Sequence, residues 1–143
     1  MRWKRNWHQW SGIGATVLLA ALAGACAAER PAGLGGVTHG IAIGGGGIKP
    51  EDLTAKRAET VVWSNATSWA EALILFEEGK GVSQACAAPV GFFLTPGGTY
   101  TSGLIAPGAE ASLCIAEPGT YEYRVQQHRS GRSCQYSGRI VVQ

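Results

Sequence analysis

The residues best suited to chemistry are few, and most lie toward the C terminus. Beyond the first 25 residues the chain has two histidines, His39 and His128, and its cysteines include Cys86, Cys114 and Cys134. Imidazole and thiolate groups are good ligands for transition metals, so a metal or redox site is the first hypothesis to weigh. Catalysis finds less support, because no Ser-His-Asp grouping, phosphate-binding glycine loop or Cys-x-x-Cys motif occurs with the spacing of a known site. We therefore predict no catalytic residues and no enzyme.

Cationic side chains surround His128 in the sequence. Arg124, Arg129, Arg132 and Arg139 occur with no Asp or Glu between them. This basic loop predicts one positive pole of the domain, which would receive an anionic ligand or protein partner. The alternative is a solvated loop whose arginines bond to carbonyl groups.

The first 25 residues have the pattern of an export signal. Three basic residues precede a short apolar stretch, residues 11–23, which is too short to span a bilayer comfortably. The stretch closes with Ala23-Gly24-Ala25-Cys26, which resembles the lipobox of bacterial lipoproteins, whose cysteine is lipidated at the cleavage site. Ordinary cleavage after Ala25 is the alternative. We expect an exported protein of the periplasm or cell surface that meets the membrane only through a lipid anchor on Cys26.

Removal of this signal changes the charge of the chain. Three of the twelve Lys and Arg residues leave and all ten acidic residues stay, so the mature chain has a net charge of −1. No basic stripe with interleaved aromatic residues is present, so we predict no nucleic-acid partner.

If Cys26 carries lipid, three cysteines remain for an oxidising compartment. They allow one disulfide and one spare thiol, and three pairings stay open. The local sequence favours Cys86 with Cys134, because both lie among loop-forming residues. Cys114 lies instead in a strand-like run, residues 112–115.

Glycine and proline divide the chain into a tether and one domain. Residues 26–40 lack any hydrophobic period and predict a flexible tether, in which His39 is expected to be solvated. Residues 41–143 alternate short apolar runs with turn signals. This pattern predicts one all-β Greek-key sandwich of about seven to eight strands.

Several aromatic side chains are expected to have structural roles. Trp63, Phe92 and Phe93 are predicted to be core residues. Tyr121 is predicted to be a corner residue whose hydroxyl caps a loop backbone, as in other Greek-key sandwiches.

Residues 68–79 are the one segment where local propensity and sandwich context disagree. A capping-box start, good helix formers and a terminal glycine favour a helix. The apolar cluster in residues 73–76 also suits a central strand, and context overrides helix propensities worth tenths of a kcal/mol per residue. We predict a strand.

Two stretches of the sequence resemble cupredoxins such as plastocyanin. Residues 48–54 followed by residues 59–65, which end in Trp63-Ser64-Asn65, resemble the opening strands of that family. Pro-Gly-Thr-Tyr-Glu-Tyr at residues 118–123 and Gly-Arg-Ile-Val-Val at residues 138–142 resemble its closing strands. The resemblance covers about 100 residues and implies a cupredoxin sandwich.

The type 1 copper site of that family takes two imidazoles, one thiolate and a weak axial methionine. The resemblance places these four ligand positions at Glu71, Val125, His128 and Tyr136, so only the second imidazole is present. We therefore expect no cofactor and no blue-copper electron transfer. The alternative is a rearranged copper site made of Glu71, His128, Cys134 and Tyr136, brought together by a loop between Val125 and Tyr136 that folds back.

The sequence thus predicts a cell-envelope cupredoxin-like lipoprotein that serves as a non-catalytic binding or structural module. Its partner is an unidentified protein or anionic ligand. A copper-binding electron carrier with rearranged ligands is the competing function.

Overall fold

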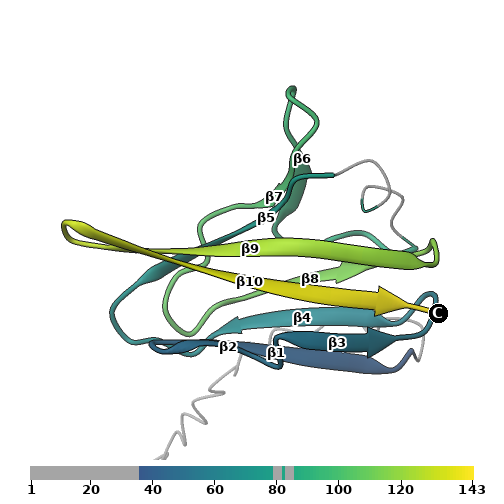
Figure 1. Cartoon of the computed structure of the whole chain (residues 1–143), viewed down its shortest axis with the longest axis horizontal. Coiled ribbons are helices and arrows are strands. Elements are labelled where there is room, and N and C mark those ends of the chain that lie inside the picture. The colour runs from purple at the N-terminus through teal and green to yellow at the C-terminus, as the bar shows by residue number, and fades with distance from the viewer. Residues whose placement is uncertain (1–35, 79–81, 83–85) are drawn as a thin grey trace, which may run out of the picture. The chain divides into compact units, whose positions relative to one another are not determined.

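The computed structural model describes residues 36–78, residue 82 and residues 86–143 (Figure 1). The predicted signal peptide and Cys26 lie outside the described residues. The named elements are ten strands: β1 (Thr38–Gly44), β2 (Gly47–Lys49), β3 (Asp52–Ala55), β4 (Thr60–Asn65), β5 (Glu71–Phe76), β6 (Phe92–Leu94), β7 (Tyr100–Ser102), β8 (Glu110–Cys114), β9 (Gly119–Arg129) and β10 (Arg132–Val142). In the described part of the chain, no helix is both long enough and apolar enough to cross a membrane.

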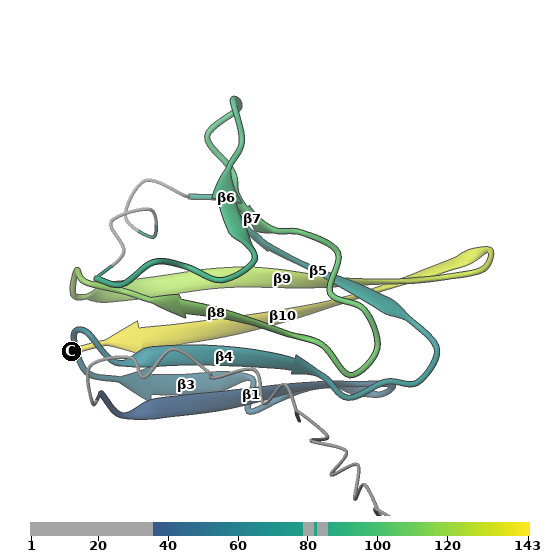
Figure 2. The same ribbon diagram turned by 180° about the vertical axis from the view of Figure 1, so that it is seen from behind.

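The strands form two facing sheets, which confirms the all-β sandwich. One sheet has the order β2-β1-β4-β8, and the other has the order β3-β10-β9-β5-β7-β6. Seen from behind in Figure 2, β8 and β4 run along the first sheet while β9 and β10 run along the second. The described residues form ten strands rather than about seven to eight, because short strands such as β2 pair across turns that the sequence marks only as glycine-rich.

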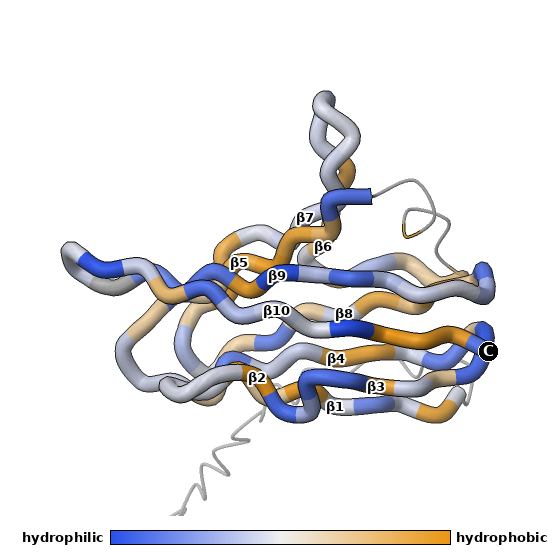
Figure 3. Tube along the Cα trace, viewed as in Figure 1, coloured by the Kyte–Doolittle hydropathy of each residue, from blue (hydrophilic) through white to orange (hydrophobic). Residues whose placement is uncertain are grey.

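Alternating burial along each strand places the core between the sheets. In β4, Val61, Trp63 and Asn65 are buried while the residues between them are half-buried, as expected for a strand whose successive side chains point to opposite faces. The Trp63 ring lies at the centre, 5.4 Å from Phe92, 5.6 Å from Tyr123 and 6.0 Å from Phe76 between ring centroids. Figure 3 shows the apolar stretches of the strands gathered in the body of the sandwich.

Phe92 is a core residue as predicted, but Phe93 is not. Phe92 is 7% exposed and Phe93 is 54% exposed. Both lie in β6, the last strand of its sheet. Consecutive strand residues point to opposite faces of a sheet, and nothing in the described residues buries the outer face at Phe93.

The segment with the disputed structure is a strand, as predicted. Glu71–Phe76 forms β5, which pairs with β9 on one side and with β7 on the other. Its even-numbered residues, Ala72, Ile74 and Phe76, are almost fully buried. Burial in the centre of a sheet outweighs the local preference for a helix.

The expected role of Tyr121 is confirmed. Its hydroxyl donates a hydrogen bond of 2.8 Å to the carbonyl oxygen of Glu117. Burial raises the pKa of Tyr121, and the neighbouring Glu117 carboxylate raises it further.

The domain begins earlier than the predicted boundary at Ile41. Strand β1 starts at Thr38 and pairs in parallel with β4, so residues 38–40 belong to the sheet and not to a tether. His39 is therefore not a solvated linker residue: its Nε2 lies 2.7 Å from Glu59 Oε2. The backbone N–H of Lys56 also donates to this carboxylate at 2.7 Å, and these two contacts, the Lys56 hydrogen bond first, lower the pKa of Glu59.

Candidate functional site

The four positions that the resemblance assigns to copper ligands lie on three adjacent strands. Glu71 begins β5, Val125 and His128 lie in β9, and Tyr136 lies in β10. The ladder pairs Glu71 with His128 and Val125 with Tyr136. All four positions are therefore neighbours in one sheet.

These positions do not converge on one point, because they divide between the two faces of the sheet. His128 is three residues from Val125, so their side chains lie on opposite faces. Glu71 and His128 share the outer face and are exposed, whereas Val125 is 0% exposed in the core. Val125 carries no lone pair, so a trigonal Cys-His-His donor set cannot be assembled from these residues.

The rearranged copper site is also contradicted by the ladder. Residues 125–136 form an antiparallel hairpin and not a loop that folds back, with β9 and β10 joined at Ser130 and Gly131. Gly131 has φ 76°, which allows the tight turn. Cys134 pairs with Gln127 and Ser133 pairs with His128, so Cys134 and His128 face opposite sides. Across the described ranges, no group of three or more His, Cys, Asp and Glu residues is placed to hold a metal ion.

The disulfide joins Cys86 to Cys114, with 5.4 Å between their Cα atoms, so the favoured Cys86–Cys134 pairing is wrong. The reason is a contact between segments distant in sequence. Val90 and Ser112 exchange two backbone hydrogen bonds of 2.9 and 3.0 Å, which hold the segment after Cys86 against β8. Cys134 is exposed and free.

A buried amide organises the end of the sandwich near Glu71, and the sequence analysis missed it. Asn65 is 1% exposed. Its Nδ2 donates to the carbonyl oxygens of Ala70 and Ile105 at 2.8 Å each. Its Oδ1 accepts from the backbone N–H of Thr67 at 3.1 Å and from the Thr67 hydroxyl at 2.7 Å. The available signal was an asparagine at the end of the Trp-x-Asn strand with a threonine two residues later.

A second buried amide sits beside the hairpin. Gln127 is 2% exposed, and its Nε2 donates to the Gly44 carbonyl oxygen at 2.8 Å. Its Oε1 accepts no hydrogen bond from the described residues. Tyr136 donates to the Gly45 carbonyl oxygen at 3.4 Å, and partial burial, with a smaller effect of Cys134, raises the pKa of Tyr136. These contacts tie the base of the hairpin to the β1–β2 turn.

The basic loop does not produce a purely positive surface. Arg124 pairs with Glu77, and Arg139 Nε lies 3.0 Å from Asp52 Oδ1. Among the arginines whose side chains the structure describes, this leaves Arg132, which is exposed at the tip of the hairpin. The side chain of Arg129 lies outside the described residues.

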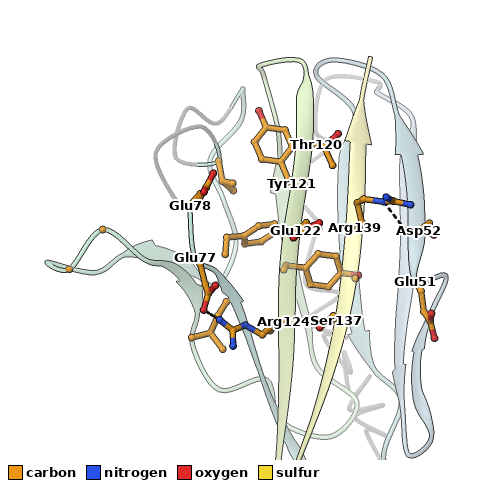
Figure 4. Close-up of a pocket in the computed structure, with 17 residues that line it drawn as sticks. Glu51, Asp52, Glu77, Glu78, Thr120, Tyr121, Glu122, Arg124, Ser137 and Arg139 are labelled. Atoms are coloured by element: carbon orange, nitrogen blue, oxygen red, sulfur yellow. Dashed lines mark hydrogen bonds and ion pairs between the residues drawn. The ribbon is translucent and has the colours of Figure 1, made fainter.

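Arg124 and Arg139 line an open cavity of about 1150 Å³ in which carboxylates outnumber guanidinium groups (Figure 4). Its acidic residues are Glu51, Asp52, Glu77, Glu78 and Glu122. An anionic ligand is therefore not favoured on this face, because the two arginines are already matched by carboxylates from β3 and from the residue that follows β5.

Comparison with known proteins supports the fold alone. No family model matches the chain, and no curated protein matches its sequence. Among solved structures, a mutant of amicyanin in the reduced Cu(I) form at pH 4 matches with a TM-score of 0.51 and 19% identity, over 81% of this chain and 88% of that one. An oxidised amicyanin mutant matches with a TM-score of 0.51 and 20% identity over the same shares.

Proposed function

Because the domain has a cupredoxin-like fold, we propose that this chain is a cell-envelope lipoprotein whose cupredoxin-like domain acts as a non-catalytic binding or structural module and has lost the type 1 copper site. One observation carries the proposal. The positions Glu71, Val125, His128 and Tyr136 supply one imidazole and no thiolate, and the sheet separates them onto two faces.

The chemistry of the donor set supports this function over electron transfer. A type 1 site uses a thiolate bond to copper to set its spectrum and potential. Val125 fills the position of that thiolate with a fully buried side chain that packs in the core. Moving Cys134 to the same position would require breaking the β9–β10 ladder, in which it is paired with Gln127.

The envelope location and the lipid anchor are parts of the same proposal. They rest on the basic head, the short apolar stretch and the Ala-Gly-Ala-Cys sequence that ends at Cys26. A domain held at a membrane surface needs no active site to act as a binding module. The partner we propose is another envelope protein or a small ligand, with no nucleic acid involved.

A copper titration tests the loss of the metal site. The protein is titrated with Cu(II) under oxidising conditions and with Cu(I) under reducing conditions, alongside His128→Ala and Cys134→Ser. We expect no stoichiometric binding and no intense visible charge-transfer band in any of the three proteins. One bound copper per chain with such a band, abolished in Cys134→Ser or His128→Ala, would establish the electron carrier instead.

The anchor is tested separately by intact mass. We expect the chain from the membrane fraction to begin at Cys26 and to carry the added mass of lipid, and Cys26→Ala to release the protein from that fraction. An unmodified chain in the soluble fraction would remove the lipoprotein part of the proposal and leave the module itself standing.

A further inference from the structure

Strand β10 has an open edge along its first half. β9 pairs with β10 from Arg132 to Val142, but β3 pairs only with Arg139–Val142. Over Arg132–Gly138, none of the described strands pairs with β10 on the second side, although β2 lies near this stretch, with Gly47 beside the Tyr136 ring. Figures 1 and 2 show this half of β10, with its partner β9, extending as a ribbon beyond the body of the sandwich.

The hydrogen bonds of β10 show which residues face the open edge. The N–H of Arg139 donates to the carbonyl oxygen of Glu51, just before β3, at 2.8 Å, and the N–H of Gln143 donates to that of Ala55 in β3 at 3.0 Å. Odd-numbered residues of β10 therefore present their backbone groups on that side. The register with β9 runs without interruption from Arg132 to Val142. Ser133, Gln135 and Ser137 therefore point their N–H and C=O groups outward, where no strand receives them.

This edge lacks the features that normally protect an exposed strand. Natural edges are blocked by charged side chains, proline or bulges. Between Ser133 and Gly138 the strand has no charged residue, no proline and no bulge. It is a template for another strand.

We infer that the open edge of β10 pairs with the same edge of a second copy of this chain, antiparallel, with the two Cys134 residues opposite each other on a two-fold axis. Such an interface is self-complementary and closes as a dimer. Ser133 of each copy then forms a hydrogen-bonded pair with Gln135 of the other. The two hairpins together become a four-stranded ribbon.

The position of Cys134 fits this register. Its backbone groups point toward β9, so the Cys134 pair across the new interface is a non-hydrogen-bonded pair, with about 4.5 Å between Cα atoms. Disulfides form at Cα separations of about 4.4 to 6.8 Å. The Cys134 thiol is exposed and free.

The charges are compatible with self-pairing. Arg132 falls opposite Tyr136 of the second copy, so no two charged residues are direct cross-strand partners between the two paired edges. The register also carries the hairpin tip, which holds Arg132 and no carboxylate, toward Glu51 of the other copy, because Glu51 accepts the Arg139 N–H at the end of the open edge.

Closure by a disulfide requires an oxidant, and a small-molecule disulfide such as oxidised glutathione is sufficient. One Cys134 thiolate attacks it, forming a mixed disulfide and releasing one glutathione thiolate. The second Cys134 thiolate then attacks the Cys134 sulfur of the mixed disulfide and releases the second glutathione. Two Cys134 thiols are oxidised to one disulfide, one glutathione disulfide is reduced to two thiols, and the two protons lost by the Cys134 thiols are taken up by the two released glutathione thiolates.

The test compares full-length wild type, Gln135→Pro and Gln135→Ala in detergent. Proline at residue 135 removes an N–H that only a second copy would accept, while alanine keeps it. In reducing buffer, sedimentation should show a wild-type dimer that persists in Gln135→Ala. In Gln135→Pro the dissociation constant of the dimer should be about ten-fold higher. With oxidised glutathione, a Cys134-linked dimer should form about ten-fold more slowly in Gln135→Pro than in Gln135→Ala.

A charge pair keeps the test decisive if the proline variant misfolds. Ser133→Lys with Gln135→Lys places lysines opposite each other twice and should abolish the dimer. Ser133→Glu with Gln135→Lys places opposite charges there and should restore it. The inference is overturned if wild type stays monomeric and only adds glutathione to Cys134, or if both charge variants dimerise equally. It is independent of copper binding, which the titration measures by itself.

Discussion

Replacing Asn65 by alanine should remove a large part of the stability of this domain. The side chain makes four hydrogen bonds, two as a donor to Ala70 and Ile105 and two as an acceptor from Thr67. A net value of about 1 kcal/mol per hydrogen bond gives a loss of about 4 kcal/mol. The Thr67 hydroxyl keeps a second contact with the Ala70 carbonyl oxygen at 2.9 Å, which reduces the expected loss to about 3 kcal/mol.

This loss is measurable because single domains are only marginally stable. Against a total of about 5 to 15 kcal/mol, Asn65→Ala should lower the urea midpoint clearly. It should also lower the melting temperature by about 10 °C or more, at about 4 °C per kcal/mol for a domain of this size. Chemical unfolding, followed by the fluorescence of the buried Trp63 and by far-ultraviolet circular dichroism, gives the free energy of unfolding.

The neighbouring Ser64→Ala is the matched control. Ser64 is half-buried on the same strand, and its hydroxyl donates only to the exposed Glu110 carboxylate at 2.9 Å. We expect a change of about 0.5 kcal/mol or less. A fall in the free energy of unfolding of less than about 1 kcal/mol in Asn65→Ala, or of no more than in Ser64→Ala, would contradict the inference that the buried amide stabilises the loop between β4 and β5 through its hydrogen bonds.

Three further predictions follow from other parts of the structure. A Cβ at Gly138 would overlap the Tyr123 ring, so Gly138→Ala should lower the free energy of unfolding by about 1 to 3 kcal/mol, as measured by chemical unfolding. Gly40→Ala is the control and should leave this free energy unchanged, because its Cβ meets open space. The pKa of Glu59 is lowered in the folded state, which adds stability above the ordinary pKa of 4.5. This stability disappears as the pH falls through the pKa of the folded state. Unfolding midpoints measured from pH 7 to pH 3 should therefore fall more steeply for wild type than for Glu59→Gln. Mass spectrometry after alkylation of the unfolded, unreduced domain should find one modified cysteine within residues 36–143, at Cys134; modification of two or three would contradict the disulfide.

The strands were predictable because their signals are local. Turn residues and two-residue alternation located most of them, and the cluster at residues 73–76 formed a strand once a buried position in a sheet was assumed. The hydroxyl contact of Tyr121 was also predictable, because it reaches a carbonyl oxygen only four residues away. Each of these features depends on a few consecutive residues.

The features that sequence analysis missed depend on segments far apart in the chain. Cys114 was set aside because it lies in a strand, but strand β8 faces the segment after Cys86 through Val90. The hairpin tip was taken for a loop because its polar residues show no alternation, since both faces of a ribbon outside the sandwich meet water. Arg124 finds its carboxylate at Glu77, just after the neighbouring strand β5, which a count along the sequence does not reveal.

The position of β10 has a consequence for how this domain folds. Although β10 comes last of the ten named strands along the chain, it lies between β3 and β9 inside the larger sheet. The pairing of β3 with β10 joins segments far apart in sequence, and contacts of this kind form slowly because a long loop must close first. We therefore expect β3 to join the larger sheet late in folding. Removal of the segment that holds Ile140 and Val142 of the core should leave β9 as an open strand, which chaperones and proteases recognise.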